Sequence, residues 1–385
     1  MIAFGLLPSF AWASSKAKAA APVPAGFVGM NIDGPALSPQ VDLGQEMSQM
    51  VATGVQRVRI VVNWLQEQPY SSYSQLPQSS VVPWTNVGGV PTDFTSTDQI
   101  VESAAAHGLQ VLPVVLYAPD WAAEHPGQNG SPPSNDAAYA NFVAALVQRY
   151  GRNGSFWAAN PSLRKVPVTA WQIWNEPNLL GYWSDRPWVP GYVNLLRAAN
   201  KAIKGVDRSA QVVLAGTPNF SWEYLAGIYR IRGARKLFDV VAVHPYTKTP
   251  RHVLGFLELV RHVMNENGDR AKPMIATEMG FPSSVGKATT IGFETTERGQ
   301  AVYSAQTIKL LAGHRPGLGL AGFDYYSWMG EEYSGAYTFN YSGLFAFTGG
   351  TVRVKPAYAA FRSVALAIEH CKVPGPLAGQ CAKRG

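Results

Sequence analysis

The 385-residue sequence has few cysteines and few of the motifs that mark metal or nucleotide chemistry. Its seven histidines show no HExxH or similar spacing, and its two cysteines, Cys371 and Cys381, both lie near the carboxyl terminus, which argues against a metal site. No Gly-x-Ser-x-Gly turn and no phosphate-cradling loop occur either. We therefore expect no metal and no cofactor.

Charged residues are also scarce, at 15% of the chain, while 46% of the residues are hydrophobic. This balance argues against disorder and supplies enough apolar side chains for a large core. The net charge is +7, yet the sequence has no long Lys/Arg run and no nucleic-acid-binding motif. We therefore predict a solvated basic surface and no nucleic-acid partner. The sequence does not specify an oligomeric state.

No apolar stretch reaches the length needed to cross a membrane, so we predict no transmembrane segment. Residues 1–13 are apolar, and the triplets at 11–13 and 17–19 resemble small-x-small cleavage sites. Although a basic n-region is missing, we interpret residues 1–25 as a secretory signal and linker, and we expect a secreted, extracellular protein. In a secreted chain, Cys371 and Cys381 are expected to form a disulfide that staples the tail at 371–385; two free thiols are the alternative.

Eight short apolar segments alternate with helical patterns between residues 26 and 370. The segments lie at 27–32, 58–62, 109–116, 166–173, 211–216, 238–243, 273–278 and 319–326. Near-continuous apolar strands that are each followed by a helix are typical of a parallel sheet. Eight such units close a (β/α)8 barrel. We therefore predict an α/β protein with a single (β/α)8 TIM-barrel domain over residues 26–370.

Two of these segments end in a lone glutamate. One runs into Trp174, Asn175, Glu176 and Pro177, where the proline stops the strand because it cannot donate a ladder hydrogen bond. The other ends at Glu278. In a TIM barrel the carboxyl ends of the strands form the active site, so both carboxylates are expected there. Such a pair suits glycosidic bond hydrolysis, in which one carboxyl protonates the leaving oxygen and the second attacks or activates water. For either glutamate alone, a structural cap or ion pair is the alternative.

The Asn-Glu-Pro motif at 175–177, after the fourth strand, and the glutamate that ends the seventh strand resemble the retaining (β/α)8 glycoside hydrolases of clan A. The sequence Ile-Trp-Asn-Glu-Pro-Asn-Leu at 173–179, with Tyr182 and Trp183 shortly after it, resembles glycoside hydrolase family 39 in particular. The resemblance covers residues 27–368. Xylosidases of that family carry an added β-sandwich for which this chain has no length, so we expect a compact, single-barrel type that cuts polysaccharides internally.

The resemblance implies roles for eight residues. Glu176 would be the acid/base and Glu278 the nucleophile. The substrate-binding residues would be Asn175 at the sugar 2-hydroxyl, Arg59 near the nucleophile, His244 and Tyr246 at the end of the sixth strand, Trp328 as the aromatic floor of the sugar subsite, and Trp183. The charge of Arg59 would keep Glu278 ionised, while the surroundings of Glu176 would keep its pKa high. From the residues alone, Arg59 could instead pair inside the barrel, and His244, Tyr246 and Trp328 could be core residues.

We therefore predict that the protein hydrolyses β-glycosidic bonds in a poly- or oligosaccharide with retention, by double displacement, acting within the chain and without a cofactor. Two alternatives remain open. A transglycosylase would use the same catalytic pair, with the aromatic loops at 64–73 and 182–188 favouring a sugar acceptor over water. A barrel that has lost catalysis would bind glycans without turnover, which the presence of both glutamates and Asn175 disfavours.

Overall fold

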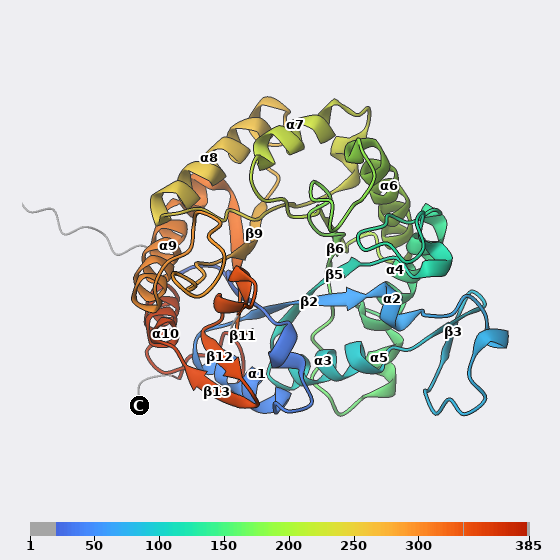
Figure 1. Cartoon of the computed structure of the whole chain (residues 1–385), viewed down its shortest axis with the longest axis horizontal. Coiled ribbons are helices and arrows are strands. Elements are labelled where there is room, and N and C mark those ends of the chain that lie inside the picture. Colours follow the sequence, from blue (N-terminus) through green and yellow to red (C-terminus); the bar gives the residue numbers. More distant parts are fainter. Residues whose placement is uncertain (1–20, 334, 383–385) are drawn as a thin grey trace, which may run out of the picture.

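The eight apolar segments form strands because each is a short run rich in β-branched and other apolar residues. In the computed structural model, which describes residues 21–333 and 335–382, they are β1 (Val28–Asn31), β2 (Arg57–Asn63), β5 (Gln110–Leu116), β6 (Ala170–Ile173), β7 (Gln211–Val213), β8 (Val241–Val243), β9 (Met274–Met279) and β10 (Leu320–Tyr325). Neighbouring strands are parallel in the order β7-β6-β5-β2-β1-β10-β9-β8, and a parallel bridge from Val213 to Val240 joins the two outer strands. The predicted (β/α)8 barrel is therefore confirmed (Figure 1).

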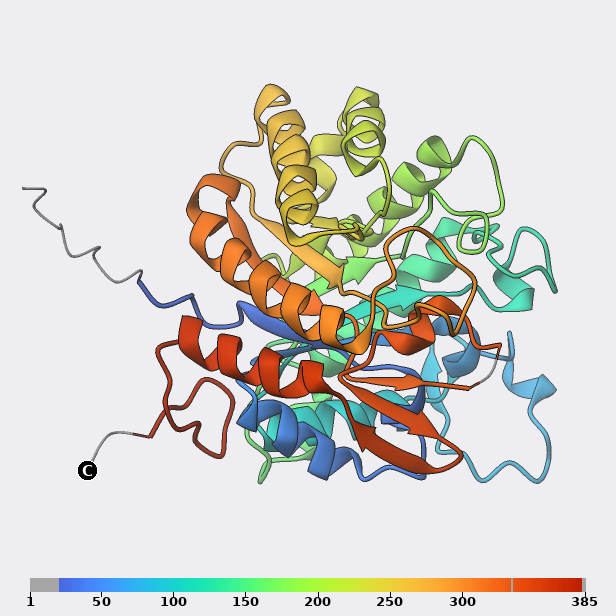
Figure 2. The same ribbon diagram turned by 60° about the vertical axis from the view of Figure 1, so that its left-hand side comes forward.

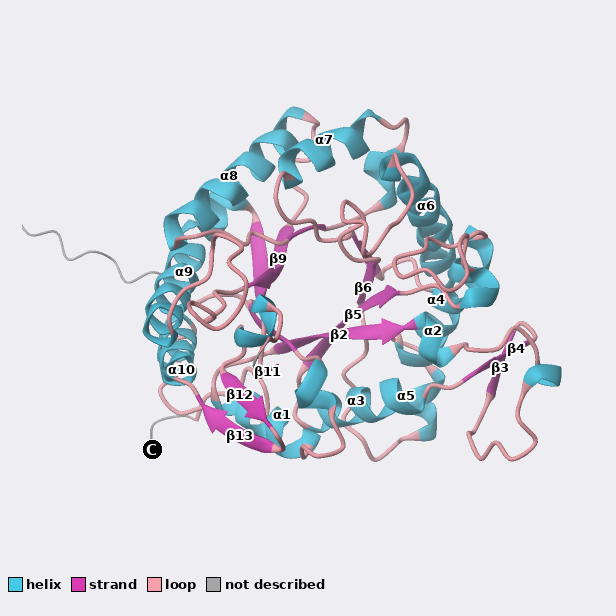
Figure 3. Ribbon diagram, in the orientation of Figure 1, coloured by secondary structure: helices cyan, strands magenta, loops and turns pink. Residues whose placement is uncertain are grey.

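Eight helices, one after each barrel strand, surround the sheet (Figure 3). They are α1 (Leu43–Ala52), α3 (Thr95–Ala106), α4 (Asp136–Tyr150), α6 (Trp188–Val206), α7 (Ser221–Arg230), α8 (Pro250–Glu266), α9 (Glu297–Leu318) and α10 (Pro356–Ile368). Each buries one face against the strands. In α6, for example, Tyr192, Leu196 and Ala199 are fully buried at spacings of three or four residues, as in an amphipathic helix.

The structure adds elements that the sequence patterns did not indicate. Two short helices, α2 (Trp64–Glu67) and α5 (Ser155–Ala159), and the hairpin of β3 (Thr85–Val87) and β4 (Val90–Thr92) lie in the connections after β2 and β5. Between β10 and α10, the strands β11 (Met329–Glu331), β12 (Phe345–Thr348) and β13 (Thr351–Val354) form a three-stranded sheet beside α10 (Figure 2). The connection from β11 to β12 supplies residues to the cavity described below.

The carboxyl-terminal tail is attached by covalent and hydrogen bonds. Cys371 and Cys381 form a disulfide with their Cα atoms 5.5 Å apart. The backbone N–H of Ala378 donates to the carbonyl of His107 at the end of α3 (2.9 Å). Among the described residues, no helix combines the length and the apolar character needed to cross a bilayer. Residues 1–20 of the interpreted signal segment and residues 383–385 of the tail lie outside the described residues.

Candidate active site

The chain bends sharply where β6 ends, and this bend places the Asn-Glu pair. Trp174 and Glu176 have φ angles of 66° and 41°, which are uncommon for residues other than glycine. The N–H of Trp174 donates to the carbonyl of Val115 (3.1 Å), and that of Glu176 to the carbonyl of Gly216 (3.0 Å). The neighbouring strands β5 and β7 therefore hold a conformation that costs free energy by itself, as is common at functional sites.

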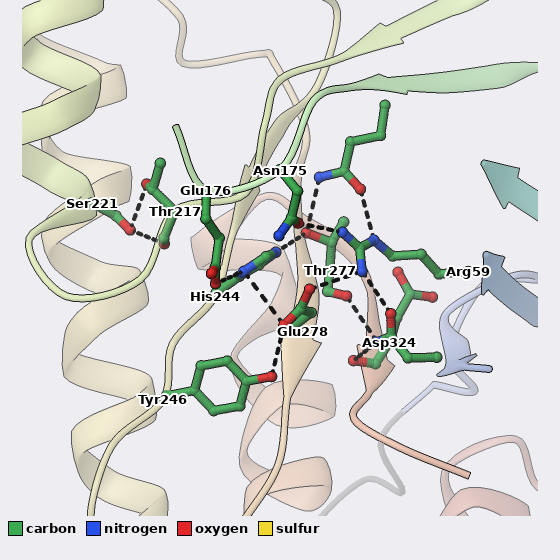
Figure 4. Close-up of polar contacts among 12 residues, drawn as sticks. Arg59, Asn175, Glu176, Thr217, Ser221, His244, Tyr246, Thr277, Glu278 and Asp324 are labelled. Carbon is green, nitrogen blue, oxygen red and sulfur yellow. Dashed lines mark hydrogen bonds and ion pairs between the residues drawn. The ribbon is translucent and has the colours of Figure 1, made fainter. Parts of the chain in front are cut away.

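Arg59 in β2 links four side chains through its guanidinium. Nε donates to Gln172 (2.7 Å), Nη1 to Asn31 (2.7 Å) and to Glu278 Oε1 (2.9 Å), and Nη2 to Asn175 Oδ1 (2.8 Å) (Figure 4). Because arginine can only donate, the amide oxygen of Asn175 must face it and the NH2 group must point away. This orientation leaves the Asn175 NH2 group as a donor for a ligand.

Glu278 is held in its ionised form by three neighbours. Burial alone would raise the pKa of Glu278, but the nearby His244, the charge of Arg59 and a hydrogen bond from Tyr246 together lower it. The Tyr246 hydroxyl donates to Glu278 Oε2 at 2.8 Å, and Arg59 holds the other carboxyl oxygen. A carboxylate kept ionised in a buried site has the charge state that a nucleophile needs.

Glu176 has the opposite electrostatic character. Burial raises the pKa of Glu176, since only 8% of the residue is exposed, and the contact with His244 only partly offsets this effect. Nδ1 of His244 lies 2.6 Å from Glu176 Oε1, and its Nε2 lies 3.1 Å from Thr277 Oγ1 (Figure 4). The two glutamates thus have pKa values that their surroundings shift in opposite directions, which is the pattern of an acid and a nucleophile in one site.

A cavity of about 660 Å³ opens at the carboxyl ends of the strands. Both glutamates line it, and an aromatic wall stands beside them. Tyr246 stacks on Phe293 with ring centroids 5.7 Å apart and meets the edge of Phe339 at 4.8 Å. Aromatic faces of this kind present large apolar surfaces to a bound ligand.

Two of the predicted substrate-binding residues lie outside the hydrogen-bonded cluster around the glutamates. Trp328 is fully buried, packs on Phe345 with centroids 4.9 Å apart, and donates its indole N–H to Glu46 at 2.5 Å. A ring with no exposed surface cannot be the floor of a sugar subsite, so this prediction is wrong. Trp183 is also buried, at 3% exposure, against Trp174. The structure does bring the other six predicted residues together: Arg59, Asn175, Glu176, His244, Tyr246 and Glu278.

The cavity also contains three residues that the sequence analysis did not select individually for the site. Asp33 follows β1, Tyr326 follows β10, and Tyr182 follows β6; all three line the cavity. Tyr326, two residues before Trp328, provides the aromatic side chain at the end of the eighth strand. The available signal for Asp33 was its position directly after an apolar strand, where a TIM barrel places its functional side chains.

One oxygen from each glutamate and one ring nitrogen of His244 lie within 4.8 Å of one another, a spacing that a metal ion could bridge. These groups are already joined by the contact between His244 and Glu176 and by the ion pair of Arg59 with Glu278 at 2.9 Å. A guanidinium at this distance already neutralises Glu278 and would repel a second cation. The donor set therefore fits a hydrogen-bonded carboxyl pair better than a metal centre.

The comparisons with known proteins agree with this fold. No family model matches the chain. A β-xylosidase from Geobacillus stearothermophilus is 26% identical over 175 residues, which are 43% of this chain and 32% of the xylosidase. The matched region therefore spans about a third of that relative.

Solved structures resemble the whole barrel. A family 39 glycoside hydrolase from Bacteroides cellulosilyticus WH2 is similar with a TM-score of 0.65 and 20% identity, over 90% of this chain and 64% of that one. A GH53 catalytic domain from Ignisphaera aggregans has a TM-score of 0.57 and 20% identity, over 90% and 99% of the two chains. A GH5_18 structure from Bifidobacterium longum has a TM-score of 0.59 and 15% identity, over 90% and 79%.

The chain is a (β/α)8 barrel whose fold is similar to those of several glycoside hydrolases. The β-xylosidase and the family 39 structure among these similar proteins agree with the resemblance that the sequence motifs indicated.

Proposed function

We propose that the protein is a retaining glycoside hydrolase that cleaves β-glycosidic bonds by double displacement, with Glu278 as the nucleophile and Glu176 as the acid/base. One observation carries the proposal: a carboxyl oxygen of each glutamate lies within 4.8 Å of the other. Retaining enzymes hold their two carboxyls about 5–5.5 Å apart, whereas inverting enzymes separate them by about 6.5–9.5 Å to admit a water molecule. The short spacing favours direct attack by Glu278.

The first step forms a covalent intermediate. The Glu278 carboxylate attacks the anomeric carbon while the bond from that carbon to the leaving oxygen breaks. The proton of Glu176 passes to the leaving oxygen, so no alkoxide has to depart. The raised pKa of Glu176 keeps that proton in place before the reaction, and the lowered pKa of Glu278 keeps the nucleophile charged.

The second step returns the enzyme to its starting state. Glu176, now ionised, takes a proton from water as the water oxygen attacks the anomeric carbon and the ester bond to Glu278 breaks. Two inversions at that carbon give net retention. The NH2 group of Asn175, which Arg59 orients, donates to the sugar 2-hydroxyl during both steps.

The cavity supports cleavage within a polymer or oligomer. Its lining continues on one side of the glutamates to Pro35 and Gly330, which follow β1 and β10, and on the other side to Leu179 and Asn219, which follow β6 and β7. These strands lie across the barrel from each other in the sheet order. Sugar units can therefore extend on both sides of the scissile bond, as endo-action requires.

We also propose that the protein acts outside the cell. The apolar segment at 1–13 with its small-x-small triplets supports export, and the disulfide between Cys371 and Cys381 suits an oxidising compartment. The expected result is recovery of the mature chain from culture medium, beginning near residue 14 or 20. Full-length chain that stays in the cytoplasm would contradict export.

The test of function is product release from plant, fungal and bacterial polysaccharides, with Glu278→Ala alongside. A matched control is Glu102→Gln, which changes an exposed carboxyl on α3. Oligosaccharides of mixed length, absent for Glu278→Ala and unchanged for Glu102→Gln, would support the proposal and identify the substrate. Monosaccharide alone would contradict endo-action, and lengthened oligosaccharides would indicate a transglycosylase. Glycan binding without turnover would contradict the enzymatic function, and activity that survives in Glu278→Ala would contradict the choice of nucleophile.

A further inference from the structure

A third carboxyl group, that of Asp33, faces the two glutamates from the end of β1. Asp33 precedes a short 3-10 helix over Gly34–Leu37, but its side chain does not cap that helix. Among the described residues it also forms no ion pair, because the nearby guanidinium of Arg59 is already bonded to Glu278, Asn175, Asn31 and Gln172. Asp33 is therefore an acceptor in the active-site cavity that the protein itself does not neutralise.

The surroundings of Asp33 disfavour its ionised form. Burial raises the pKa of Asp33 to about 6, and the charge of Glu278 adds to this rise, although the Tyr326 hydroxyl and Arg59 partly oppose it. Asp33 is half-buried, and the Tyr326 hydroxyl uses only part of the hydrogen-bonding capacity of its carboxylate, which can accept several hydrogen bonds. Because Asp33 lines the cavity, a ligand there can supply a further donor.

The barrel order places Asp33 on the glycone side of the reaction. β1 lies between β2 and β10, next to the strands that carry Arg59 and Tyr326, whereas β6, which carries Glu176, lies three strands further round. Glu176 must face the leaving oxygen to protonate it. A sugar attacked by Glu278 must therefore direct its ring away from Glu176, which is toward Asp33.

The shape of the cavity agrees with this direction. A smaller hollow of about 260 Å³ adjoins the main cavity and is lined by Asp33, Arg59, Asn175, Tyr117 and Glu278, but not by Glu176. The main cavity of about 660 Å³ is lined by Glu176, but not by Asn175. The two share Asp33, Tyr182, Glu278 and Tyr326. Asn175 and Glu176 thus line different compartments, and Asp33 lies with Glu278 where the two compartments meet.

We propose that Asp33 is a specificity-determining residue, whose carboxylate accepts a hydrogen bond from a hydroxyl at C3 or C4 of the sugar ring that Glu278 attacks. This inference rests on the proposed function and deepens it. The Asp33 carboxylate selects glycones with a free hydroxyl on the ring edge opposite the leaving group. It discriminates against sugars that are deoxygenated or substituted there. A site built to bond a hydroxyl rejects the analogue that lacks it, because the buried acceptor is then left unpaired.

The test is a kinetic comparison of Asp33→Asn and Asp33→Ala with wild-type protein. The probes are the 4-nitrophenyl β-glycoside that the wild-type protein hydrolyses fastest and its 3-deoxy and 4-deoxy analogues. On the parent compound we expect both variants to lose about 10- to 100-fold in kcat/KM, the effect of removing one hydrogen bond to a charged group. On the analogue that lacks the contacted hydroxyl, kcat/KM of the wild-type protein should fall to the value that the variants show on the parent compound. The kcat/KM of the variants should differ by less than about threefold between the parent compound and this analogue.

Equal losses on the parent and on both deoxy analogues would overturn the proposal, because a merely structural role of Asp33 has that result. Unchanged kcat/KM in both variants would overturn it as well. Glu102→Gln is the control for removal of a carboxyl far from the cavity, and thermal unfolding of each variant checks the fold. Failure of the proposed function has a different result, since the wild-type protein would then release no nitrophenol and no oligosaccharide.

Discussion

Nδ1 of His244 lies 2.6 Å from Oε1 of Glu176, and the same nitrogen lies 3.6 Å from Oε2 of Glu278. The ring is fully buried, and its other nitrogen is 3.1 Å from the hydroxyl of Thr277. His244 therefore contacts both the proposed acid/base and the proposed nucleophile and fixes their spacing. The protonation states of both glutamates depend on this contact, since it lowers the pKa of each.

The space for His244 depends on Gly216, after β7. A Cβ atom at this position would lie 2.1 Å from Nε2 of His244, a distance that requires the ring to move. We predict that Gly216→Ala lowers kcat by at least about tenfold, because small displacements of catalytic groups are costly. The matched control is Gly205→Ala in α6, where nothing lies within 4 Å of the added atom. Equal activity of the two variants would contradict the positioning role of His244.

The two glutamates should differ in their response to azide. With a substrate whose leaving group needs no protonation, Glu176→Ala should still form the intermediate but hydrolyse it slowly, and azide should restore turnover and give a β-glycosyl azide. In Glu278→Ala the rate of the first step should fall by far more than the 10²–10⁴-fold that is typical of a missing general acid. Azide should then give an α-glycosyl azide. Analysis of the azide products by NMR checks the assignment. Exchanged anomeric configurations would mean that the roles of the two residues are reversed.

The pH dependence of kcat/KM should be bell-shaped. The reaction needs Glu278 ionised, so activity is lost as the pH falls through the lowered pKa of Glu278. It also needs Glu176 protonated, so activity is lost as the pH rises through the raised pKa of Glu176. In Glu176→Ala, assayed with an activated leaving group, the alkaline limb should disappear and the acid limb should remain. An alkaline limb that persists in this variant would belong to another group.

Tyr246 should control the acid limb of that profile. Its hydroxyl donates to Glu278 Oε2 at 2.8 Å and so favours the ionised form. Tyr246→Phe removes this bond, and we expect the acid limb to move up by about one pH unit, which corresponds to about 1.4 kcal/mol. Tyr73→Phe, which changes an exposed ring in the short 3-10 helix Tyr73–Gln75 after α2, is the control. A lower kcat/KM with an unshifted acid limb would mean that Tyr246 contacts the substrate alone.

A buried carboxyl outside the site should make stability depend on pH. Glu67 in α2 is 5% exposed, and burial raises its pKa to about 8 from an ordinary value of 4.5. Between these two values the unfolded chain binds fewer protons than the folded one, so the free energy of unfolding should fall as the pH rises, by up to about 1.4 kcal/mol per pH unit. Below pH 4.5 this contribution is fully present, and it is lost above about pH 8.

Glu67→Gln should remove that part of the pH dependence, because the amide does not ionise. Denaturant unfolding at pH 5 and at pH 8 measures the difference. Glu102→Gln on the neighbouring helix α3 should leave the slope unchanged, since Glu102 is exposed. Identical pH slopes for Glu67→Gln and the wild-type protein would show that Glu67 is ionised in the folded state.

The barrel and the positions of the two glutamates were predictable because their signals are local. A strand of apolar residues stopped by Pro177 places Glu176 at a strand end, and the run before Glu278 does the same on β9. Once eight such strands are counted, barrel closure brings their ends together. Arg59, His244 and Tyr246 were implied by the resemblance to clan A glycoside hydrolases, and each lies within or just after a barrel strand.

The remaining features depend on side-chain packing, which the pattern of apolar and polar residues in the sequence does not specify. Trp328 and Trp183 lie near strand ends, as sugar-binding rings do, but the side chain of each turns into the core. The small sheet of β11, β12 and β13 was missed because its strands have only three or four residues and the Gly349-Gly350 turn is the only strong signal. Asp33 was missed because a single aspartate after a strand resembles an ordinary helix cap.

The most direct test of the central claim is the anomeric configuration of the sugar at the new reducing end, followed by NMR during the first minutes of hydrolysis. We predict that the β-anomer appears first and that the α-anomer grows in later by mutarotation, since Glu278 and Glu176 lie close enough for double displacement. Initial release of the α-anomer would mean single displacement by water, and it would contradict Glu278 as the nucleophile.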